Sequence, residues 1–425
     1  MNTLEIAKKN TLTLILTLIT FQSCSQSDAL QNMSAEKWQL DLDYLVDVTT
    51  SEFALFTTES KQRFTTSATK LRSQLPHLTS NNSIIEISRL MALLNEGHTE
   101  LKLFGSDLGF QRLPLILYYF GKDLRIVASS KEYKSLLGAK VISIGNSTIE
   151  ETHKKIAPLI SGDNEIENYY RVPQHIIIPE ILNELRIIND PSFVEFTVSL
   201  IDGTEQNISI SSDSIKVYSK IDFVHIRNEQ SPPLYRQNTN DQNVRHWFKY
   251  LDNQKVMYYR IFGFGDRKGY LTLKKKTKQV FKEMDEVQAK KLVIDLRSNG
   301  GGNYELGLSI VENILKRPEI MKNGNLYVII NRATFSAAGY IAALLKKDCN
   351  AIVIGEKSSD NPNGADNYER HTLPHSKLIF GVADRTKTNF PEITKPYLSL
   401  DIEFEFEFND YVEGYDPVIN YIFEN

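Results

Sequence analysis

The stretch VIDLRSNGGG, residues 293–302, decides the fold of this 425-residue chain. The residues before the glycines are apolar enough to form a buried strand, and a helical pattern follows them. Three consecutive glycines let backbone N–H groups turn outward into a small concavity that suits a phosphate or an oxyanion. The stretch lacks both the Lys-Ser/Thr sequence and the GxGxxG spacing of nucleotide-binding loops, which weakens the nucleotide reading.

A second stretch, VIINRATFSAAGY at residues 328–340, has a similar form. The pattern predicts a strand that turns at Ala333 and Thr334 and a helix that starts at Ser336. A hydroxyl at a helix N-terminus lies beside free N–H groups that stabilise a developing negative charge. Serine is also common at this place as a simple helix cap. Taken alone, this segment favours the cap over a nucleophile.

Strands and helices alternate on both sides of these stretches. Helical patterns cover residues 272–289, 304–316 and 336–347, and the apolar runs bounded by turns are residues 256–261, 291–296, 326–331 and 351–355. This alternation predicts an α/β layer with largely parallel strands, in which sites form at the carboxyl ends of the strands. We therefore predict an α/β core over residues 245–425.

Two further domains are expected upstream. Apolar positions recur at spacings of three and four over residues 34–97, which predicts a helical domain spanning residues 34–99. Residues 100–215 carry short β-like segments, and the strand that leads into the turn at Gly145 and Asn146 resembles that of a PDZ-like module. Such modules bind extended peptides at a sheet edge. An unrelated small β domain is the alternative.

The N-terminus has the features of a bacterial secretion signal. Two lysines at residues 8–9 precede an apolar run over residues 12–21, and Cys24 follows. The placement of Cys24 resembles a lipobox, so we expect residues 1–24 to be a signal peptide and Cys24 to carry lipid. An ordinary signal peptide with an incidental cysteine is the alternative, and the run is too short to span a bilayer. A membrane-anchored lipoprotein of the cell envelope is expected.

Composition and charge limit the kinds of partner that the chain can bind. A formal net charge of −4 with 24% charged residues offers no basic stripe for nucleic acid. Cys349 has no intramolecular partner once Cys24 is lipidated, and neither cysteine has metal-ligand spacing. The sequence predicts no disulfide scaffold, no metal and no cofactor.

Together, residues 293–302, the junction at Ser336 and the sequence IGE at residues 354–356 resemble peptidase family S41. This family contains the C-terminal processing and tricorn-core-like serine peptidases, and the resemblance is good over residues 245–425 and looser upstream. It implies a nucleophile at Ser336. It also implies an oxyanion hole formed by the backbone N–H groups of Ala337 and of one glycine in residues 300–302, for which we select Gly301.

The resemblance also bears on the general base. The processing branch uses a lysine whose expected position here is Asn361, and Lys357 lies four residues too early, so a Ser/Lys dyad is absent. The tricorn-like branch uses an upstream histidine, and the sequence EGHT at residues 96–99 resembles its motif. This implies that His98 is the base, and Thr99 is a possible member of its hydrogen-bond network.

A carboxylate near the C-terminus orients the base in that branch, and Glu392 lies nearest the expected place. It precedes a strand-like segment, residues 398–408, whose acidic residues alternate and so share one solvated face. Those acidic residues are therefore poor candidates for the orienting role.

The predicted function is hydrolysis of peptide bonds in peptides or proteins, by an S41-like endopeptidase. The alternative is a lipoprotein of the same fold that binds peptides or small molecules after its catalytic apparatus has decayed. A hydrolase on another α/β scaffold would be expected to carry a Gly-x-Ser-x-Gly elbow, and none is present. The sequence gives no indication of the oligomeric state.

Overall fold

A six-stranded sheet forms the centre of the C-terminal part of the chain. The computed structural model describes residues 30–104, 108–227, 232–237, 246–266, 268 and 272–425. The strands run in the order β10 (His246–Leu251), β11 (Val256–Ile261), β12 (Lys291–Asp295), β13 (Leu326–Ile330), β14 (Ile352–Gly355) and β17 (Ile402–Glu403). All neighbours are parallel except β10 and β11.

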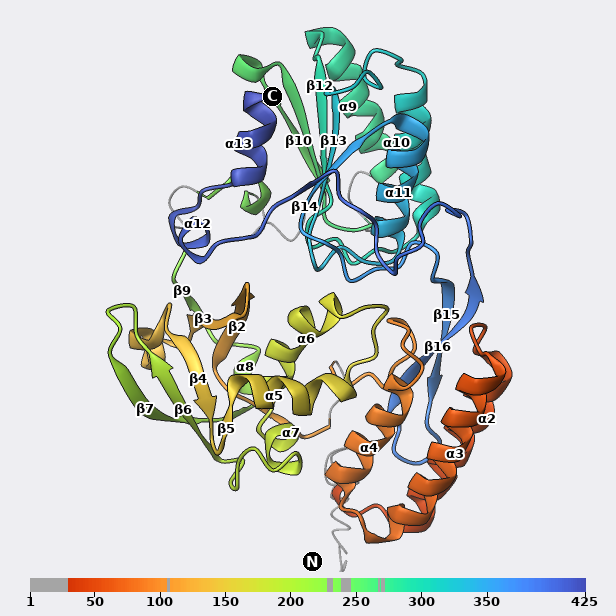
Figure 1. The fold of residues 1–425 in the computed structure, drawn as a ribbon, viewed down its shortest axis with the longest axis vertical. Helices are drawn as coiled ribbons and strands as arrows, with labels where there is room; N and C mark the ends of the chain where they lie inside the picture. Colours follow the sequence, from red (N-terminus) through yellow and green to blue (C-terminus); the bar gives the residue numbers. More distant parts are fainter. Residues whose placement is uncertain (1–29, 105–107, 228–231, 238–245, 267, 269–271) are drawn as a thin grey trace, which may run out of the picture.

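Helices cover both faces of this sheet (Figure 1). One face packs on α9 (Leu273–Val287), α10 (Tyr304–Leu315) and α11 (Ala337–Cys349), and the other packs on α13 (Pro417–Glu424). The side chains of β12 alternate between the two apolar clusters, and both are buried. Burial on both faces explains why the central strands read as continuous apolar runs. The α/β prediction is confirmed, and these element bounds agree with the expected ones to within two residues.

Three helices form the N-terminal part of the described chain. They are α2 (Ala35–Glu52), α3 (Thr58–Gln74) and α4 (Ser80–Ala92). Each begins at a hydroxyl residue whose side chain accepts a backbone N–H of the first turn: Ser34, Thr57 and Thr79. The apolar side chains of the three helices pack into one shared cluster, as their spacing of three and four residues predicts.

The middle of the chain folds into an antiparallel sheet. Its strands run in the order β2 (Leu115–Phe120), β3 (Asp123–Ser129), β4 (Lys140–Ile144), β6 (Phe193–Ser199) and β7 (Glu205–Ser211). Three helices between β4 and β6 were not predicted: α5 (Ile149–Ile156), α6 (Ile166–Ile176) and α7 (Pro179–Glu184). The PDZ-like character of this unit stays a prediction.

Short elements complete the chain. They are β1 (Gln111–Arg112), β5 (Ser147–Thr148), β8 (Asp213–Ser214), α8 (Ile215–Tyr218), β9 (Val224–His225) and α12 (Phe408–Glu413), with single 3-10 turns at Leu75–His77, Lys131–Leu136, Ala157–Leu159, Leu234–Arg236 and Asp252–Gln254. Among the described residues, no helix is long and apolar enough to cross a membrane.

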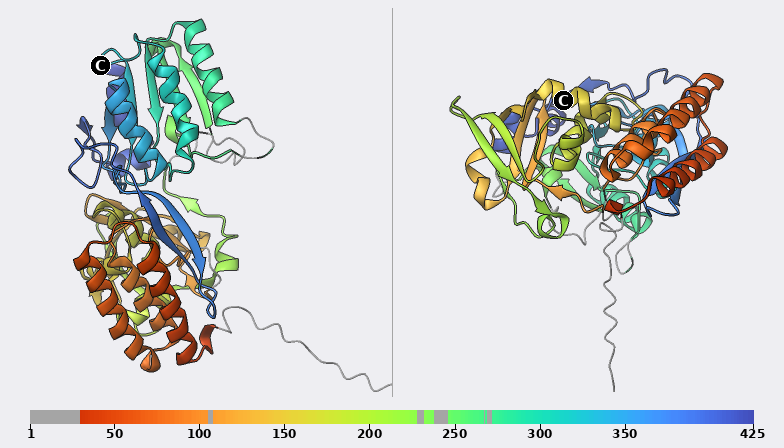
Figure 2. Two further views of the ribbon diagram at one scale, coloured as in Figure 1. Left: turned by 90° about the vertical axis from the view of Figure 1, so that its right-hand side faces the viewer. Right: turned by 90° about the horizontal axis from the view of Figure 1, so that it is seen from below.

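A long hairpin leaves the C-terminal core and packs on the N-terminal helices. Its strands are β15 (Ala365–Thr372) and β16 (Ile379–Thr386), and Figure 2 shows it descending beside α2 to α4. Its apolar side chains lie in the cluster of those helices. The main chain of β16 also bonds the segment that follows α4: Gly381 N–H donates to the Glu100 carbonyl at 2.9 Å. The hairpin therefore connects the end of the helical part to the core.

The strand expected over residues 398–408 is mostly absent. Within this range only Ile402–Glu403 forms a strand, β17, which pairs with the last two residues of β14. The predicted alternation of exposure is nevertheless present: Asp401, Glu403, Glu405 and Glu407 are exposed, whereas the residues between them are partly buried.

Candidate active site

Ser336 lies between β13 and α11 in a strained backbone conformation, with φ 58° and ψ −126°. Residues other than glycine adopt this region of backbone φ and ψ at a cost of about 1–3 kcal/mol, and such residues cluster at functional sites. The N–H of Ser336 donates to Asp360 Oδ1 at 2.5 Å. Gly339 leaves room for this carboxyl, because a Cβ there would lie 1.9 Å from Asp360 Oδ2. Packing by Asp360 therefore holds the strained turn.

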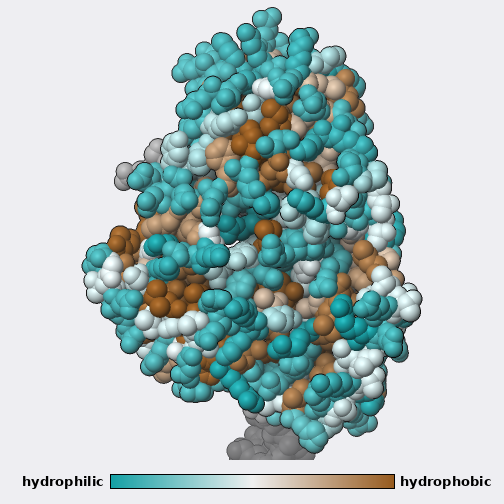
Figure 3. Space-filling view, viewed as in Figure 1, coloured by the Kyte–Doolittle hydropathy of each residue, from teal (hydrophilic) through white to brown (hydrophobic). Residues whose placement is uncertain are grey.

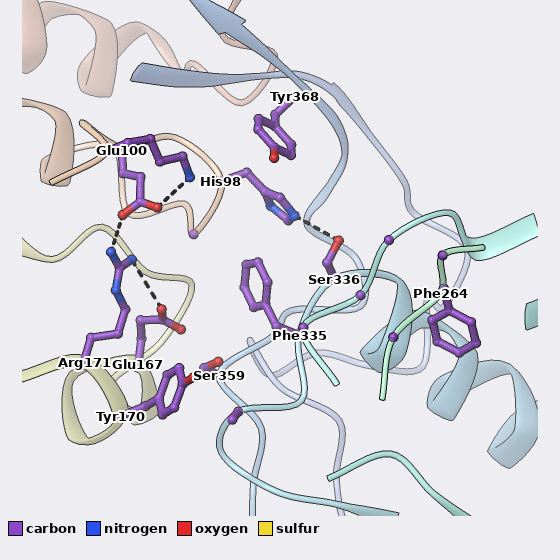
Figure 4. Close-up of a pocket in the computed structure, with 18 of the residues that line it drawn as sticks. His98, Glu100, Glu167, Tyr170, Arg171, Phe264, Phe335, Ser336, Ser359 and Tyr368 are labelled. Carbon is purple, nitrogen blue, oxygen red and sulfur yellow. Dashed lines mark hydrogen bonds and ion pairs between the residues drawn. The ribbon is translucent and has the colours of Figure 1, made fainter. Parts of the chain in front are cut away.

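The Ser336 hydroxyl does not act as a helix cap. It accepts none of the described N–H groups of α11 and instead lies 3.0 Å from His98 Nε2. Figure 4 shows the two side chains pointing toward each other from opposite sides of the pocket. The structure thus brings together two residues that the sequence separates by 238 positions.

The His98 ring is buried between two aromatic rings. Its centroid lies 4.7 Å from that of Phe335 and 5.3 Å from that of Tyr368. Tyr368 belongs to β15, and Phe335 precedes the serine, so both the hairpin and the core fix the ring. A Cβ at Gly97 would lie 2.6 Å from the Phe335 ring, which explains the glycine before the histidine.

Glu96 orients this ring. Its Oε1 lies 2.8 Å from His98 Nδ1 and accepts the His98 backbone N–H at 2.9 Å. Its Oε2 accepts the Thr99 hydroxyl at 2.6 Å, and Thr99 Oγ1 accepts the N–H of Ala383 in β16. With the proton on Nδ1 donated to the carboxylate, Nε2 is free to accept the serine proton.

Glu96 and His98 shift each other's pKa toward the charged forms. Burial lowers the pKa of His98, but the hydrogen bond and charge of Glu96 outweigh burial and raise the pKa overall. Burial likewise raises the pKa of Glu96, whereas hydrogen bonds from His98 and Thr99 and the charge of His98 bring it below its usual value. A buried carboxylate therefore stabilises the imidazolium that forms when His98 takes a proton.

The structure does not bring Glu392 to His98. Glu392 is exposed, and Glu96 occupies the Nδ1 side of the ring. Glu96 was not predicted as the orienting carboxylate, although it lies two residues before the histidine. The adjacency was visible in the sequence, but only the turn over residues 96–99 makes the two side chains meet.

The predicted oxyanion donors differ in availability. The Ala337 N–H meets no acceptor in the described chain, because it opens α11. The Gly301 N–H, in contrast, donates to Asn299 Oδ1 at 2.9 Å. Gly301 does lie against Ser336, since a Cβ on it would be 2.7 Å from Ser336 Cβ. The N–H groups of its neighbours Gly300 and Gly302 meet no acceptor among the described residues, and both glycines line the pocket.

A pocket of about 670 Å³ surrounds the pair. One wall is glycine-rich backbone, and the other carries a partly buried set of ion pairs (Figure 4), in which Arg171 contacts Glu100 and Glu167. Figure 3 shows the surface hollowed between the core above and the other two parts below. The aromatic lining consists of Tyr170, Phe262, Phe264, Phe335 and Tyr368. The site therefore lies where the three parts of the chain meet.

The remaining predicted positions are also placed. At the lysine position of the processing branch, Asn361 donates its backbone N–H to Asp163 at 3.1 Å. Lys357 Nζ pairs with Glu403 at 2.8 Å. The described residues contain no cluster of three or more metal-ligating side chains. Cys349 is buried and unbridged, and Cys24 lies outside the described residues.

Comparison with known proteins finds a likeness to one peptidase family. The model of peptidase family S41 matches residues 255–323, which contain β11, α9, β12 and the three glycines. The C-terminal processing peptidase, chloroplastic, of Tetradesmus obliquus is 27% identical over 100 residues, covering 19% of this chain. The match spans only 22% of that relative's length.

Solved structures extend the likeness to almost the whole chain. The crystal structure of mature CPAF superposes with a TM-score of 0.64, covering 91% of this chain and 96% of that one at 11% identity. Mature CPAF complexed with lactacystin gives a TM-score of 0.64 at 11% identity, covering 92% of this chain and 97% of that one. At such identity the likeness concerns the fold alone. The chain is therefore similar to peptidase family S41 over residues 255–323, and it shares the fold of mature CPAF over almost its whole length.

Proposed function

We propose that this chain is a serine endopeptidase that hydrolyses peptide bonds through an acyl-enzyme at Ser336, with His98 as general base. The observation that carries the proposal is the 3.0 Å contact between Ser336 Oγ and His98 Nε2, made by a serine in a strained turn. Glu96 stands behind the base at 2.8 Å. Nucleophile, base and orienting carboxylate in series make up the arrangement that activates a serine hydroxyl.

The reaction follows from these positions. Ser336 Oγ attacks the carbonyl carbon while His98 Nε2 takes its proton, and the Ala337 N–H with a glycine N–H binds the resulting oxyanion. The C–N bond then breaks as His98 returns the proton to the leaving amine. Water attacks the ester, loses a proton to His98, and the proton passes to Ser336 as the acid product leaves. A general base supplies about 10²–10⁴-fold and one oxyanion donor about 10²–10³-fold.

Cleavage of peptides that are blocked at both ends tests this proposal. We expect the mature chain to cut a mixture of acetylated and amidated peptides internally, with products identified by mass spectrometry. The Ser336→Ala variant serves as the matched control and is expected to yield no products. Intact peptides after incubation with folded wild-type protein would instead favour the binding function, and retention of peptides on the immobilised protein would then identify it.

We further propose that Cys24 is lipidated and anchors the protein in the cell envelope. The support is the basic pair, the apolar run and the cysteine that follows. Metabolic labelling with an alkyne fatty acid in a bacterial host is expected to mark the wild-type chain and to leave Cys24→Ala unlabelled. Equal labelling of both, or of neither, would contradict lipidation at this residue.

A further inference from the structure

Asp163 lies between α5 and α6 and connects the loop that carries His98 to the loop after β14, whose Asp360 binds the main chain of Ser336. Its Oδ1 accepts the N–H of Gly97 at 3.0 Å, next to His98. Its Oδ2 accepts the N–H of Asn361 at 3.1 Å, next to the Asp360 that holds the nucleophile's main chain. One carboxylate thus bridges a loop after α4 and a loop after β14.

Neighbouring residues make the same connection. Ser161 Oγ donates to the Glu96 carbonyl at 2.8 Å. Asn164 Nδ2 donates to the carbonyls of Pro396 at 2.7 Å and Ser358 at 3.3 Å. Residues 161–164, which we call the clamp loop, are therefore bonded to the base-bearing loop on one side and to the core on the other.

We propose that the clamp loop sets the distance between His98 and Ser336, and that Asp163 is its positioning residue. The inference rests on the proposed catalytic pair. The clamp loop belongs to the middle part of the chain, whereas His98 follows the helical part and Ser336 belongs to the core. Through the clamp loop, the middle part of the chain contributes to the geometry of the active site, although the loop supplies no reacting atom. A displacement of about 1 Å between reacting groups costs on the order of 10²-fold in rate.

The electrostatic surroundings make this contact depend on pH. Burial and the charge of Glu96 raise the pKa of Asp163 to about 7. Glu96 and His98 face it from the loop after α4, and Asp360 faces it from the loop after β14. In its ionised form Asp163 offers two acceptor oxygens, and its charge helps to raise the pKa of His98. Asp163→Asn keeps one acceptor, places an amide donor against the other N–H, and removes the charge.

Labelling of Ser336 by a fluorophosphonate across pH tests the inference. For Asp163→Asn we expect labelling slowed at least about tenfold, with the acid limb of the profile moved to lower pH because His98 loses a neighbouring negative charge. Asp202→Asn is the matched control, since Asp202 accepts the N–H of Thr204 in an exposed turn of the β sheet unit. Ser161→Ala is expected to slow labelling without moving the limb.

Amide hydrogen exchange separates failure of the clamp from failure of the proposed function. Loss of protection at Gly97 and Asn361 is expected in Asp163→Asn, whether or not Ser336 reacts. An unlabelled wild-type Ser336 would count against the proposed function only. Unchanged exchange at these two amides would overturn the clamp, and so would a labelling profile identical to that of a wild type whose Ser336 reacts.

Discussion

Ser336 combines two properties that a helix-capping serine does not have. Its φ of 58° is unfavourable for a residue with a side chain, and its hydroxyl meets a histidine. The unfavourable conformation costs about 1–3 kcal/mol and is retained because Asp360 binds the N–H. The strain exposes the hydroxyl, so stability and activity are opposed at this residue.

Glycine at this position is expected to relieve that strain. Ser336→Gly should be more stable than Ser336→Ala by about 1 kcal/mol, because glycine adopts positive φ freely. Urea denaturation of both inactive variants measures the difference. At Ser309, inside α10, the order should reverse by about 1 kcal/mol, since glycine is unfavourable in a helix interior. The same order at both sites would contradict the strain at Ser336.

Glu96→Gln isolates the effect of the carboxylate charge. The glutamine keeps the size of the side chain but no longer raises the pKa of His98. Because only neutral His98 acts as base, the acid limb of the pH–rate profile should move to lower pH. The maximal rate should fall on the order of 10²–10⁴-fold, since the imidazolium loses its partner. Glu392→Gln serves as the control, and an equal loss there would reinstate Glu392 as the orienting residue.

At the scale of elements, β16 fixes the segment that carries the base. Gly381 faces the His98 carbonyl, and a Cβ on Gly381 would lie 2.5 Å from that oxygen. Gly381→Ala should therefore displace His98 and slow Ser336 labelling roughly tenfold. Glu369→Ala, on the exposed face of the partner strand β15, should leave the rate unchanged. Equal rates for both variants would show that the hairpin does not position the base.

The end of β12 carries a buried ion network that stabilises the core. Asp295 accepts the guanidinium of Arg297, which also contacts Asp416 at the start of α13. Burial raises the pKa of Asp295, but the charges of Arg297 and Arg260 outweigh burial and lower it to about 2. A lowered pKa means that this stability is present above the unfolded value near 4 and is lost as the pH falls toward 2.

Arg297→Met should destabilise the protein by about 3–5 kcal/mol, because a buried carboxylate loses its main partner. The loss should shrink as the pH falls from about 5 toward 2, since protonated Asp295 needs no cation. Arg317→Met, which removes an ion pair with the exposed Asp285, should cost about 1 kcal/mol or less. Chemical denaturation across pH measures both, and equal losses would contradict the network's role.

For the molecule as a whole, the sequence predicts the parts better than their contacts. The core strands and helices follow from apolar periodicity, and the pairing of Ser336 with His98 follows from the resemblance to a family. The contact of Asp163 with Gly97 and Asn361 joins three segments that are far apart in the sequence. No local sequence pattern predicts it. The hydrogen bond that occupies the Gly301 N–H likewise depends on where the Asn299 side chain lies.

The site is assembled from all three parts of the chain. The helical part ends near His98, the proposed base, and the core carries Ser336, the proposed nucleophile. The middle part bonds the loop of His98 and the loop after β14. Reactivity at Ser336 therefore depends on the whole fold, and a local sequence match is insufficient for it.

The most direct test of the Ser336–His98 pair is fluorophosphonate labelling of the folded chain, with the adduct mapped by mass spectrometry. We predict one adduct on Ser336 and a labelling rate that falls on the order of 10²–10⁴-fold in His98→Ala. Circular dichroism confirms that the variant is folded. An unmodified Ser336 in folded wild-type protein, or an undiminished rate in His98→Ala, would contradict the catalytic pair.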